Sequence, residues 1–235
     1  MTDRARLDEL AGSLDAVQRR IALACRDVGR DPGEVTLIAV SKTWPASDVL
    51  LMSSLGVTDF GESYDQEAAA KAGALRAAGV DVRWHFVGRL QRNKCRSVAR
   101  YADVVQSVDR VEIADALAAG ARDGGRRPEV LVQISLDGAE GRGGVAVDRV
   151  GELTAHIASL DRLVLRGVMA VAPLGAAPRP VFAVLAQVAA ELRASYPHAT
   201  VVSAGMTGDL EDAVAEGATH VRVGTALFGQ RPRHG

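Results

Sequence analysis

Hydrophobic residues near the start of the chain recur at steps of three and four, as on one face of a helix. They are Leu7, Leu10, Leu14, Val17, Ile21 and Ala24. This spacing predicts an amphipathic helix, which Gly29 and the pair Asp31-Pro32 would end. We therefore expect one long helix in front of the elements that follow.

Short apolar runs alternate with helical patterns through the rest of the chain. The strand-like runs are 35–40, 57–60, 82–87, 103–107, 129–135, 163–170, 200–203 and 219–223. The helical runs are about 46–55, 64–78, 92–100, 109–122, 147–159, 178–194 and 208–216. This order predicts an α/β fold, a single TIM-type (β/α)8 barrel spanning residues 1–235 with an extra N-terminal helix. A doubly wound open sheet is the alternative, because strand count alone does not prove closure.

Composition narrows the class of protein. The 235 residues suit one barrel, and the 48% hydrophobic content is ample for a core. A net charge of -1 argues against a partner such as nucleic acid or a membrane surface. No apolar stretch approaches the roughly 20 residues that span a bilayer, and no secretory signal follows the first residues.

Cys25 and Cys95 lie far apart in the sequence and lack metal-ligand spacing. We interpret them as reduced thiols and expect a cytoplasmic protein. A closed barrel leaves no sheet edge that demands a partner strand, so we expect a monomer. Segments 138–144 and 173–180, rich in glycine or proline, are predicted to be loops over the mouth of the barrel.

The most informative polar residue is Lys42, which follows the apolar run 35–41. A run that is apolar on both faces predicts a buried parallel strand, whose carboxyl end is where α/β folds keep their active sites. There a desolvated lysine can lose its proton and attack an aldehyde to form a Schiff base. A solvated surface lysine is the ordinary alternative. Residues at the other strand ends must therefore show whether Lys42 belongs to a site.

Three further strand ends carry segments with polar residues or glycine. These segments are 60–64, 85–94 and 166–170. Each has a structural interpretation: Gly61 and Gly88 can serve tight turns, Glu62 can cap a helix, and His85 can be a satisfied core histidine. Taken singly, these structural interpretations are favoured.

The last two strand-to-helix loops, 203–210 and 222–229, carry glycines and hydroxyls. Each precedes a predicted helix, where backbone N–H groups and the helix dipole favour phosphate. Loops seven and eight are also the usual phosphate site of this barrel. Helix capping by Thr207 and Asp209 would explain one loop, but not the pairing of both.

A strand-end amine opposite a phosphate site suits an aldehyde that bears a phosphate. Two ligands fit this description, pyridoxal 5′-phosphate and the sugar phosphate substrate of an aldolase. The five histidines are scattered, and none pairs with Cys, Asp or Glu at ligand spacing. We therefore expect no metal site.

Six segments resemble the pyridoxal-phosphate homeostasis protein family, also called the PROSC or YggS-type family. They are 39–43, 60–64, 84–94, 166–170, 205–207 and 221–225, within a likeness that extends from about residue 7 to 230. The resemblance implies a barrel like the N-terminal domain of alanine racemase. It also implies that Lys42 holds pyridoxal 5′-phosphate as an internal aldimine.

The resemblance assigns the other contacts residue by residue. Thr207, Gly224, Thr225 and the backbone near Met206 would bind the phosphate, and Arg222 would lie by the pyridine nitrogen. The family usually has asparagine where this chain has Ser63, so that contact with the ring differs here. It usually has serine at Thr207, which keeps the hydroxyl. Segment 141–144 replaces a more typical Lys-Ser-Gly.

Family members carry or buffer the cofactor and generally lack convincing turnover, so the resemblance implies a binding protein and not an enzyme. Arginine stays protonated, so Arg222 would leave the ring nitrogen unprotonated and the ring a weaker electron sink. Racemisation also needs an opposing acid–base group, which in alanine racemase is a tyrosine from a second domain. We expect no such domain here, and Tyr64 is the one tyrosine at a predicted strand end. A minimal amino-acid racemase, and delivery of cofactor to apo-enzymes, remain the alternatives.

Overall fold

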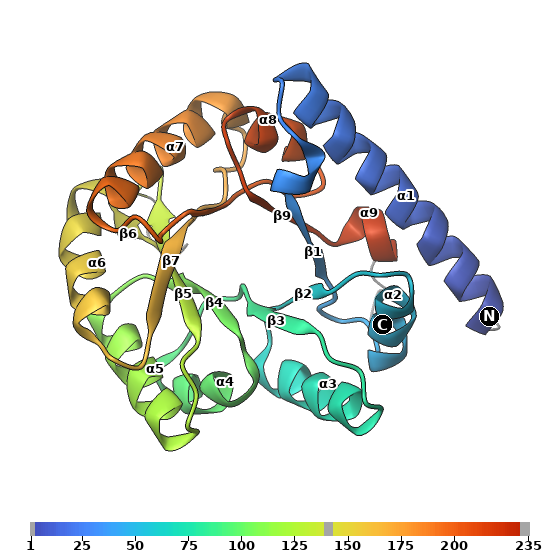
Figure 1. Cartoon of the computed structure of the whole chain (residues 1–235), viewed down its shortest axis with the longest axis horizontal. Helices are drawn as coiled ribbons and strands as arrows, with labels where there is room; N and C mark the ends of the chain where they lie inside the picture. Colours follow the sequence, from blue (N-terminus) through green and yellow to red (C-terminus); the bar gives the residue numbers. More distant parts are fainter. Residues whose placement is uncertain (1–2, 139–142, 231–235) are drawn as a thin grey trace.

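Eight parallel strands form a closed barrel (Figure 1) in the computed structural model, which describes residues 3–138 and 143–230. Around the barrel the strands pair in the order β1-β2-β3-β4-β5-β7-β8-β9, with β9 pairing back to β1. Because the β4–β5 and β1–β9 pairings both exist, the sheet has no break. The predicted barrel is confirmed, and the open doubly wound sheet is wrong.

The strands of the barrel are β1 (Thr36–Val40), β2 (Asp59–Glu62), β3 (Arg83–Phe86), β4 (Val104–Val108), β5 (Glu129–Ser135), β7 (Val164–Met169), β8 (Val201–Ser203) and β9 (His220–Val223). The α-helices are α1 (Asp3–Asp27), α2 (Ala46–Ser54), α3 (Asp65–Ala77), α4 (Cys95–Tyr101), α5 (Val111–Asp123), α6 (Val150–Ser159), α7 (Pro178–Ser195), α8 (Leu210–Ala215) and α9 (Thr225–Phe228). Three short 3-10 helices, Pro32–Glu34, Arg92–Lys94 and Val147–Arg149, complete the pattern.

Two strands differ from the prediction by more than one residue at an end. Strand β2 begins and ends two residues later than the predicted 57–60, because Glu62 lies inside the strand, buried and bonded to Lys71. Its polar side chain had marked the start of a loop, and the prediction that it caps a helix is wrong. Strand β6 (Val145–Ala146) was not predicted, since two residues carry no periodicity. Part of the predicted loop 138–144 lies outside the described residues.

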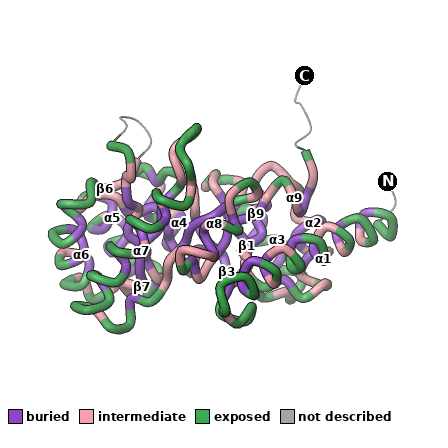
Figure 2. Tube along the Cα trace, turned by 90° about the horizontal axis from the view of Figure 1, so that it is seen from above, coloured by how far each residue is buried: buried purple, intermediate pink, exposed green. Residues whose placement is uncertain are grey.

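The core between the barrel and its helices is made mainly of aliphatic side chains, with a few aromatic ones such as Phe60, Trp84 and Phe182. Figure 2 shows buried residues in the strands and exposed residues along the outer helices. A second, small cluster of Val104, Leu131 and Met169 lies apart from this core. Strands buried on both faces account for the continuous apolar runs in the sequence. Some polar side chains are also fully buried, and several of them lie in or beside the site described next.

The predicted N-terminal helix is α1, which lies outside the ring beside α2, α8 and α9 (Figure 1). Arg6 donates to the Asp48 carboxylate at 2.6 Å and to the Phe228 carbonyl at 3.0 Å. Arg20 donates to the Thr207 carbonyl at 2.8 Å. The helix is therefore bonded directly to the loop that follows β8 and to the last residue of α9. Within residues 3–138 and 143–230, no helix is long and apolar enough to cross a membrane.

Candidate functional site

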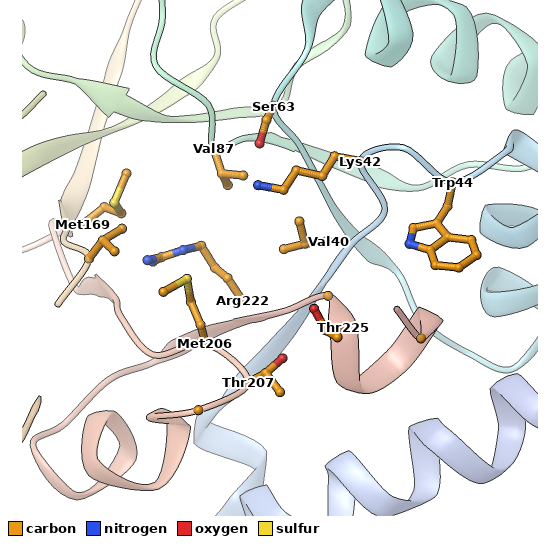
Figure 3. A pocket seen from close by; sticks show the side chains of 14 residues that line it. Val40, Lys42, Trp44, Ser63, Val87, Met169, Met206, Thr207, Arg222 and Thr225 are labelled. Atoms are coloured by element: carbon orange, nitrogen blue, oxygen red, sulfur yellow. The ribbon is translucent and has the colours of Figure 1, made fainter. Parts of the chain in front are cut away.

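A pocket of about 540 Å³ lies at the carboxyl ends of the barrel strands. The side chains around it are shown in Figure 3. It is lined by Val40, Lys42, Trp44, Ser63, Val87, Met169, Val171, Met206, Thr207, Gly208, Arg222, Gly224, Thr225 and Gly229. All seven residues assigned to cofactor binding from the sequence line this one pocket. They come from the ends of four strands, as expected for a barrel of this class.

Lys42 lies two residues beyond β1, and its side chain extends into the pocket (Figure 3). It is half-buried. The next residue, Thr43, has a φ of 72°, in the left-handed region. The chain turns here, with the Trp44 N–H bonded to the Ser41 carbonyl at 3.0 Å. The indole of Trp44 points away from the Lys42 amine and stacks on Phe228 with a centroid distance of 6.0 Å.

The loop after β8 is tightly shaped. Gly205 has a φ of +85°, and a Cβ there would lie 2.6 Å from the Cβ of Ala213. The Asp209 carboxylate accepts the Met206 N–H at 2.6 Å, within the loop, and it makes no side-chain cap to α8. Helix capping by Asp209 therefore does not explain this segment. Because the Met206 N–H is already bonded, a phosphate would compete with Asp209 for it.

The loop after β9 approaches the end of β1 closely. A Cβ on Gly224 would lie 3.2 Å from the Val40 carbonyl oxygen, so a side chain here would crowd the floor of the pocket. Helix α9 begins at Thr225, and the first N–H groups of a helix have no intrahelical acceptor. Figure 3 shows the hydroxyls of Thr207 and Thr225 close together, across the pocket from the Lys42 amine. The pocket thus has an amine at one side, and hydroxyls with the start of a helix at the other.

Arg222 lies inside the barrel, 5% exposed, and forms part of the pocket. Its Nη1 donates to the Ser203 hydroxyl at 2.7 Å, and its Nη2 donates to the Ala170 carbonyl at 2.8 Å. Both acceptors are neutral. Burial lowers the pKa of Arg222 to about 10, opposed by the charge of Asp209. The guanidinium therefore stays charged at neutral pH, despite its burial.

A chain of hydrogen bonds continues from Ser203 through the barrel interior. Ser203 donates to the Gln106 Oε1 at 2.7 Å, and the Gln106 Nε2 lies 2.9 Å from the His85 Nδ1. An amide nitrogen only donates, so Nδ1 accepts and the His85 proton is on Nε2. That nitrogen lies 2.9 Å from Asp59 Oδ1. Each group donates to the next, from the Arg222 cation to the Asp59 anion.

Both ring nitrogens of His85 are bonded, which confirms the interpretation of His85 as a satisfied core histidine. The hydrogen bond from His85 keeps the pKa of Asp59 below its usual range although burial opposes this. Asp59 is therefore the anion at the far end of the chain that begins at Arg222. Sequence reasoning missed this role of Asp59 and Gln106, because polar residues within strands appear isolated until the barrel closes.

The other candidate segments fall around the pocket or outside it. From segment 85–94 only Val87 lines the pocket, and from 166–170 only Met169 does. Gly88 is needed for close packing and not only for a turn, because a Cβ there would lie 2.7 Å from the Ser63 Cα. The arginines of α1 that bond to α9 and to the loop after β8 were also missed. In residues 3–138 and 143–230, no group of three or more His, Cys, Asp or Glu side chains could hold a metal ion.

The fold and the site together define a class of protein: a closed α/β barrel whose pocket offers an amine, a buried cation and two hydroxyl-bearing loops. A model of the alanine racemase N-terminal domain matches residues 13–232. The pyridoxal phosphate homeostasis protein of Mycobacterium leprae is 42% identical over 95% of this chain and 93% of its own length. The Escherichia coli K12 protein of the same name is 40% identical over 96% of this chain and 98% of its own.

The chain therefore belongs to the alanine racemase N-terminal domain family, within the group of pyridoxal phosphate homeostasis proteins. Among solved structures, PipY of Synechococcus elongatus with PLP bound is 35% identical, with a TM-score of 0.81 over 94% of this chain and 100% of that one. Alanine racemase from Corynebacterium glutamicum is 18% identical, with a TM-score of 0.69 over 97% of this chain and 63% of that one. That likeness shows the shared fold alone.

Proposed function

We propose that this chain binds pyridoxal 5′-phosphate and serves in the homeostasis of that cofactor. The observation that carries the proposal is the geometry of one pocket, which sets Lys42 across from Thr207 and Thr225. The similar proteins named for pyridoxal phosphate homeostasis, and PipY with PLP bound, support it. Pyridoxal phosphate supplies an aldehyde that condenses with an amine, a phosphate, and a ring whose nitrogen accepts a hydrogen bond.

The residues of the pocket suit these three parts of the ligand. Lys42 offers the amine, and the loops at 205–207 and 224–225 would hold the phosphate through hydroxyls and backbone N–H groups. Arg222, charged and fixed by two hydrogen bonds, would donate to the ring nitrogen. Ser63, beside the ring position, is shorter than the asparagine usual in the family and would leave that edge of the ring less tightly held.

We propose further that the protein holds the cofactor without robust turnover. Of the described residues that line the pocket, only Lys42 and Arg222 carry ionisable side chains. Burial leaves the Arg222 pKa at about 10, so at neutral pH it cannot accept a proton. Proton transfer at two faces of a bound amino acid needs a second acid–base group. Tyr64, the tyrosine nearest in sequence to a pocket residue, is not among those that line the pocket.

The test is the visible spectrum of the purified protein with added pyridoxal 5′-phosphate, before and after borohydride reduction. We expect a yellow protein, a reduced adduct mapped by mass to Lys42, and no adduct in Lys42→Ala. The chain has three lysines, Lys42, Lys71 and Lys94, so the assignment is direct. A colourless wild-type protein that ignores the added cofactor would show the proposal to be wrong.

A minimal amino-acid racemase is the second candidate, favoured by the fold shared with alanine racemase and by the presence of Lys42 and Arg222 in one pocket. It predicts exchange of the substrate α-proton in deuterated water at ordinary enzyme rates. The homeostasis proposal predicts exchange no faster than that of free cofactor with amino acid. Delivery to apo-enzymes would appear as transfer faster than spontaneous dissociation from this protein.

A further inference from the structure

The segment that carries Lys42 is held in an unusual backbone conformation. Among the described residues, Thr43 is the one non-glycine residue with positive φ, at 72°. For a β-branched residue this conformation is strained, and it persists only where surrounding contacts fix it. Contacts close to Lys42 must therefore fix the conformation of Thr43.

Glu67, on α3, holds Thr43 itself. Its Oε1 accepts the Thr43 N–H at 2.5 Å and also accepts from the Lys71 Nζ at 2.6 Å. Glu67 and Lys71 are four residues apart, so both side chains lie on one face of the helix. The strained residue is thus tied to a rigid element and not to another loop.

Lys71 and Glu62 hold the residue on the other side of Lys42. The Lys71 Nζ donates to the Ser41 carbonyl at 2.7 Å and to the Glu62 Oε1 at 2.7 Å. The Ser41 hydroxyl donates to the same Glu62 oxygen at 2.6 Å. Backbone atoms on both sides of Lys42 are therefore bonded to one ion cluster, which we define as Glu62, Glu67 and Lys71.

The cluster is largely shielded from water, since the Lys71 and Glu62 side chains are 6% and 1% exposed. Charge-assisted bonds in such a site are short and strong. The Lys71 ammonium has three N–H donors, and its three acceptors are Ser41 O, Glu62 Oε1 and Glu67 Oε1. An ammonium has no lone pair, and all three of its N–H groups are bonded here. Lys71 therefore fixes the backbone at Ser41 and does not act as a nucleophile.

We infer that Glu62, Glu67 and Lys71 are positioning residues that aim the Lys42 amine at the ligand's aldehyde, an inference that rests on the proposed function. On meeting the aldehyde, Lys42 would attack its carbon through the neutral amine to form a C=N bond, and both amine protons would leave with the aldehyde oxygen as water. The cluster touches neither reactant and acts through the backbone of residues 41–43.

The test compares two probes, pyridoxal 5′-phosphate and pyridoxine 5′-phosphate, whose alcohol cannot condense with an amine. Both need the phosphate loops, and only the first needs a correctly aimed amine. Glu67→Ala removes the acceptor for Thr43, whereas Glu67→Gln keeps an oxygen at that place. Glu67 is the cluster member with the most exposed side chain, at 28%, so its replacement is the one best tolerated. Glu112→Ala, the same substitution at an exposed position of α5, is the matched control.

Glu67→Ala is expected to slow borohydride-trappable capture on Lys42 by roughly 10- to 100-fold, the effect of a small misplacement of a reacting group. Its affinity for pyridoxine 5′-phosphate should stay within about twofold of wild type, a difference under ~0.5 kcal/mol. Glu67→Gln should recover much of the capture rate, and Glu112→Ala should match wild type. Far-UV circular dichroism checks that each variant is folded.

Two outcomes would overturn the inference. Capture at the wild-type rate in Glu67→Ala means that the cluster does not aim Lys42. An equal loss for both probes, or an unfolded Glu67→Ala together with a normal Lys71→Met, means that the cluster only supports the barrel. A wild-type protein that binds neither probe instead contradicts the proposed function, so the two failures are distinguishable.

Discussion

Arg222 donates from Nη1 to the hydroxyl of Ser203 at 2.7 Å, and this bond joins two neighbouring strands inside the barrel. It is the first bond of the chain that ends on Asp59. A buried guanidinium normally needs a carboxylate beside it. Here three neutral groups, Ser203, Gln106 and His85, separate the guanidinium from the anion at the end of the chain, Asp59. The cationic face of Arg222 is therefore left available to the pocket.

The middle of this chain should contribute measurably to stability. Gln106→Leu would leave the Ser203 O–H without its acceptor and the His85 Nδ1 without its donor. Buried polar groups left unpaired cost about 1–3 kcal/mol each. We expect Gln106→Leu to lower the free energy of unfolding by at least that amount in urea denaturation. Gln187→Leu, on an exposed face of α7, should change it by less than ~0.5 kcal/mol.

The ion pair between α1 and α2 should be one of the stronger contacts of the N-terminal helix. Both Arg6 and Asp48 have side chains 9% exposed, and the Arg6 guanidinium also lies 4.9 Å from the Trp44 ring centre. Arg6→Ala leaves a buried carboxylate unpaired, so we expect a loss of about 3–5 kcal/mol. Arg4→Ala, whose side chain is 82% exposed, is the control and should cost ~0–0.5 kcal/mol. Equal unfolding midpoints for the two variants would contradict this account.

A methyl group at residue 88 should disturb the pocket through Ser63. The added Cβ would lie 2.7 Å from the Ser63 Cα and 2.9 Å from its carbonyl carbon, so the backbone must move. We expect Gly88→Ala to lose about 1–3 kcal/mol of stability and to weaken binding of pyridoxal 5′-phosphate in an equilibrium titration. Gly73→Ala, within α3, meets nothing within 4 Å and should be neutral or stabilising. Wild-type affinity in Gly88→Ala would show that Ser63 does not need its present place.

Acid should destabilise the protein through His220. Burial is the main cause that lowers the pKa of His220 to about 4. In the unfolded chain a histidine titrates near pH 6.5, so between about pH 6.5 and 4 the unfolded state binds a proton that the folded state does not. Stability therefore falls as pH drops through this window, by roughly 3 kcal/mol in all for this group.

The measurement is the free energy of unfolding at a series of pH values for wild type and His220→Asn. The difference between the two curves isolates His220 from Glu62, whose pKa is raised mainly by burial. Thr219, Asp59, Arg83 and Arg222 also face the ring or its charge, and they are common to both proteins. His198→Gln, at an exposed site, should keep the wild-type slope. Parallel curves for wild type and His220→Asn would contradict the prediction.

The sequence alone determined the barrel and most of its elements. Buried parallel strands must be apolar on both faces, and amphipathic helices must repeat at three and four residues, so both leave readable patterns. Strand β5 was predicted residue for residue, and α2 and α7 to within one residue at their ends. The strand-end position of Lys42 and the glycine and hydroxyl loops after β8 and β9 were readable for the same local reason.

Only the tertiary structure decided how these groups are held. The cluster of Glu62, Glu67 and Lys71 bonds to residues 41–43, which lie more than 20 positions away from Glu67 and Lys71. The chain from Arg222 to Asp59 also joins residues distant in sequence, so no local pattern encodes either set of contacts. Their side chains are polar within buried elements, which is why Glu62 appeared to lie outside its strand. Closure of the barrel brings the partners together, so that these hydrogen bonds can form. A polar residue that appears misplaced in the sequence is thereby a stable part of the interior.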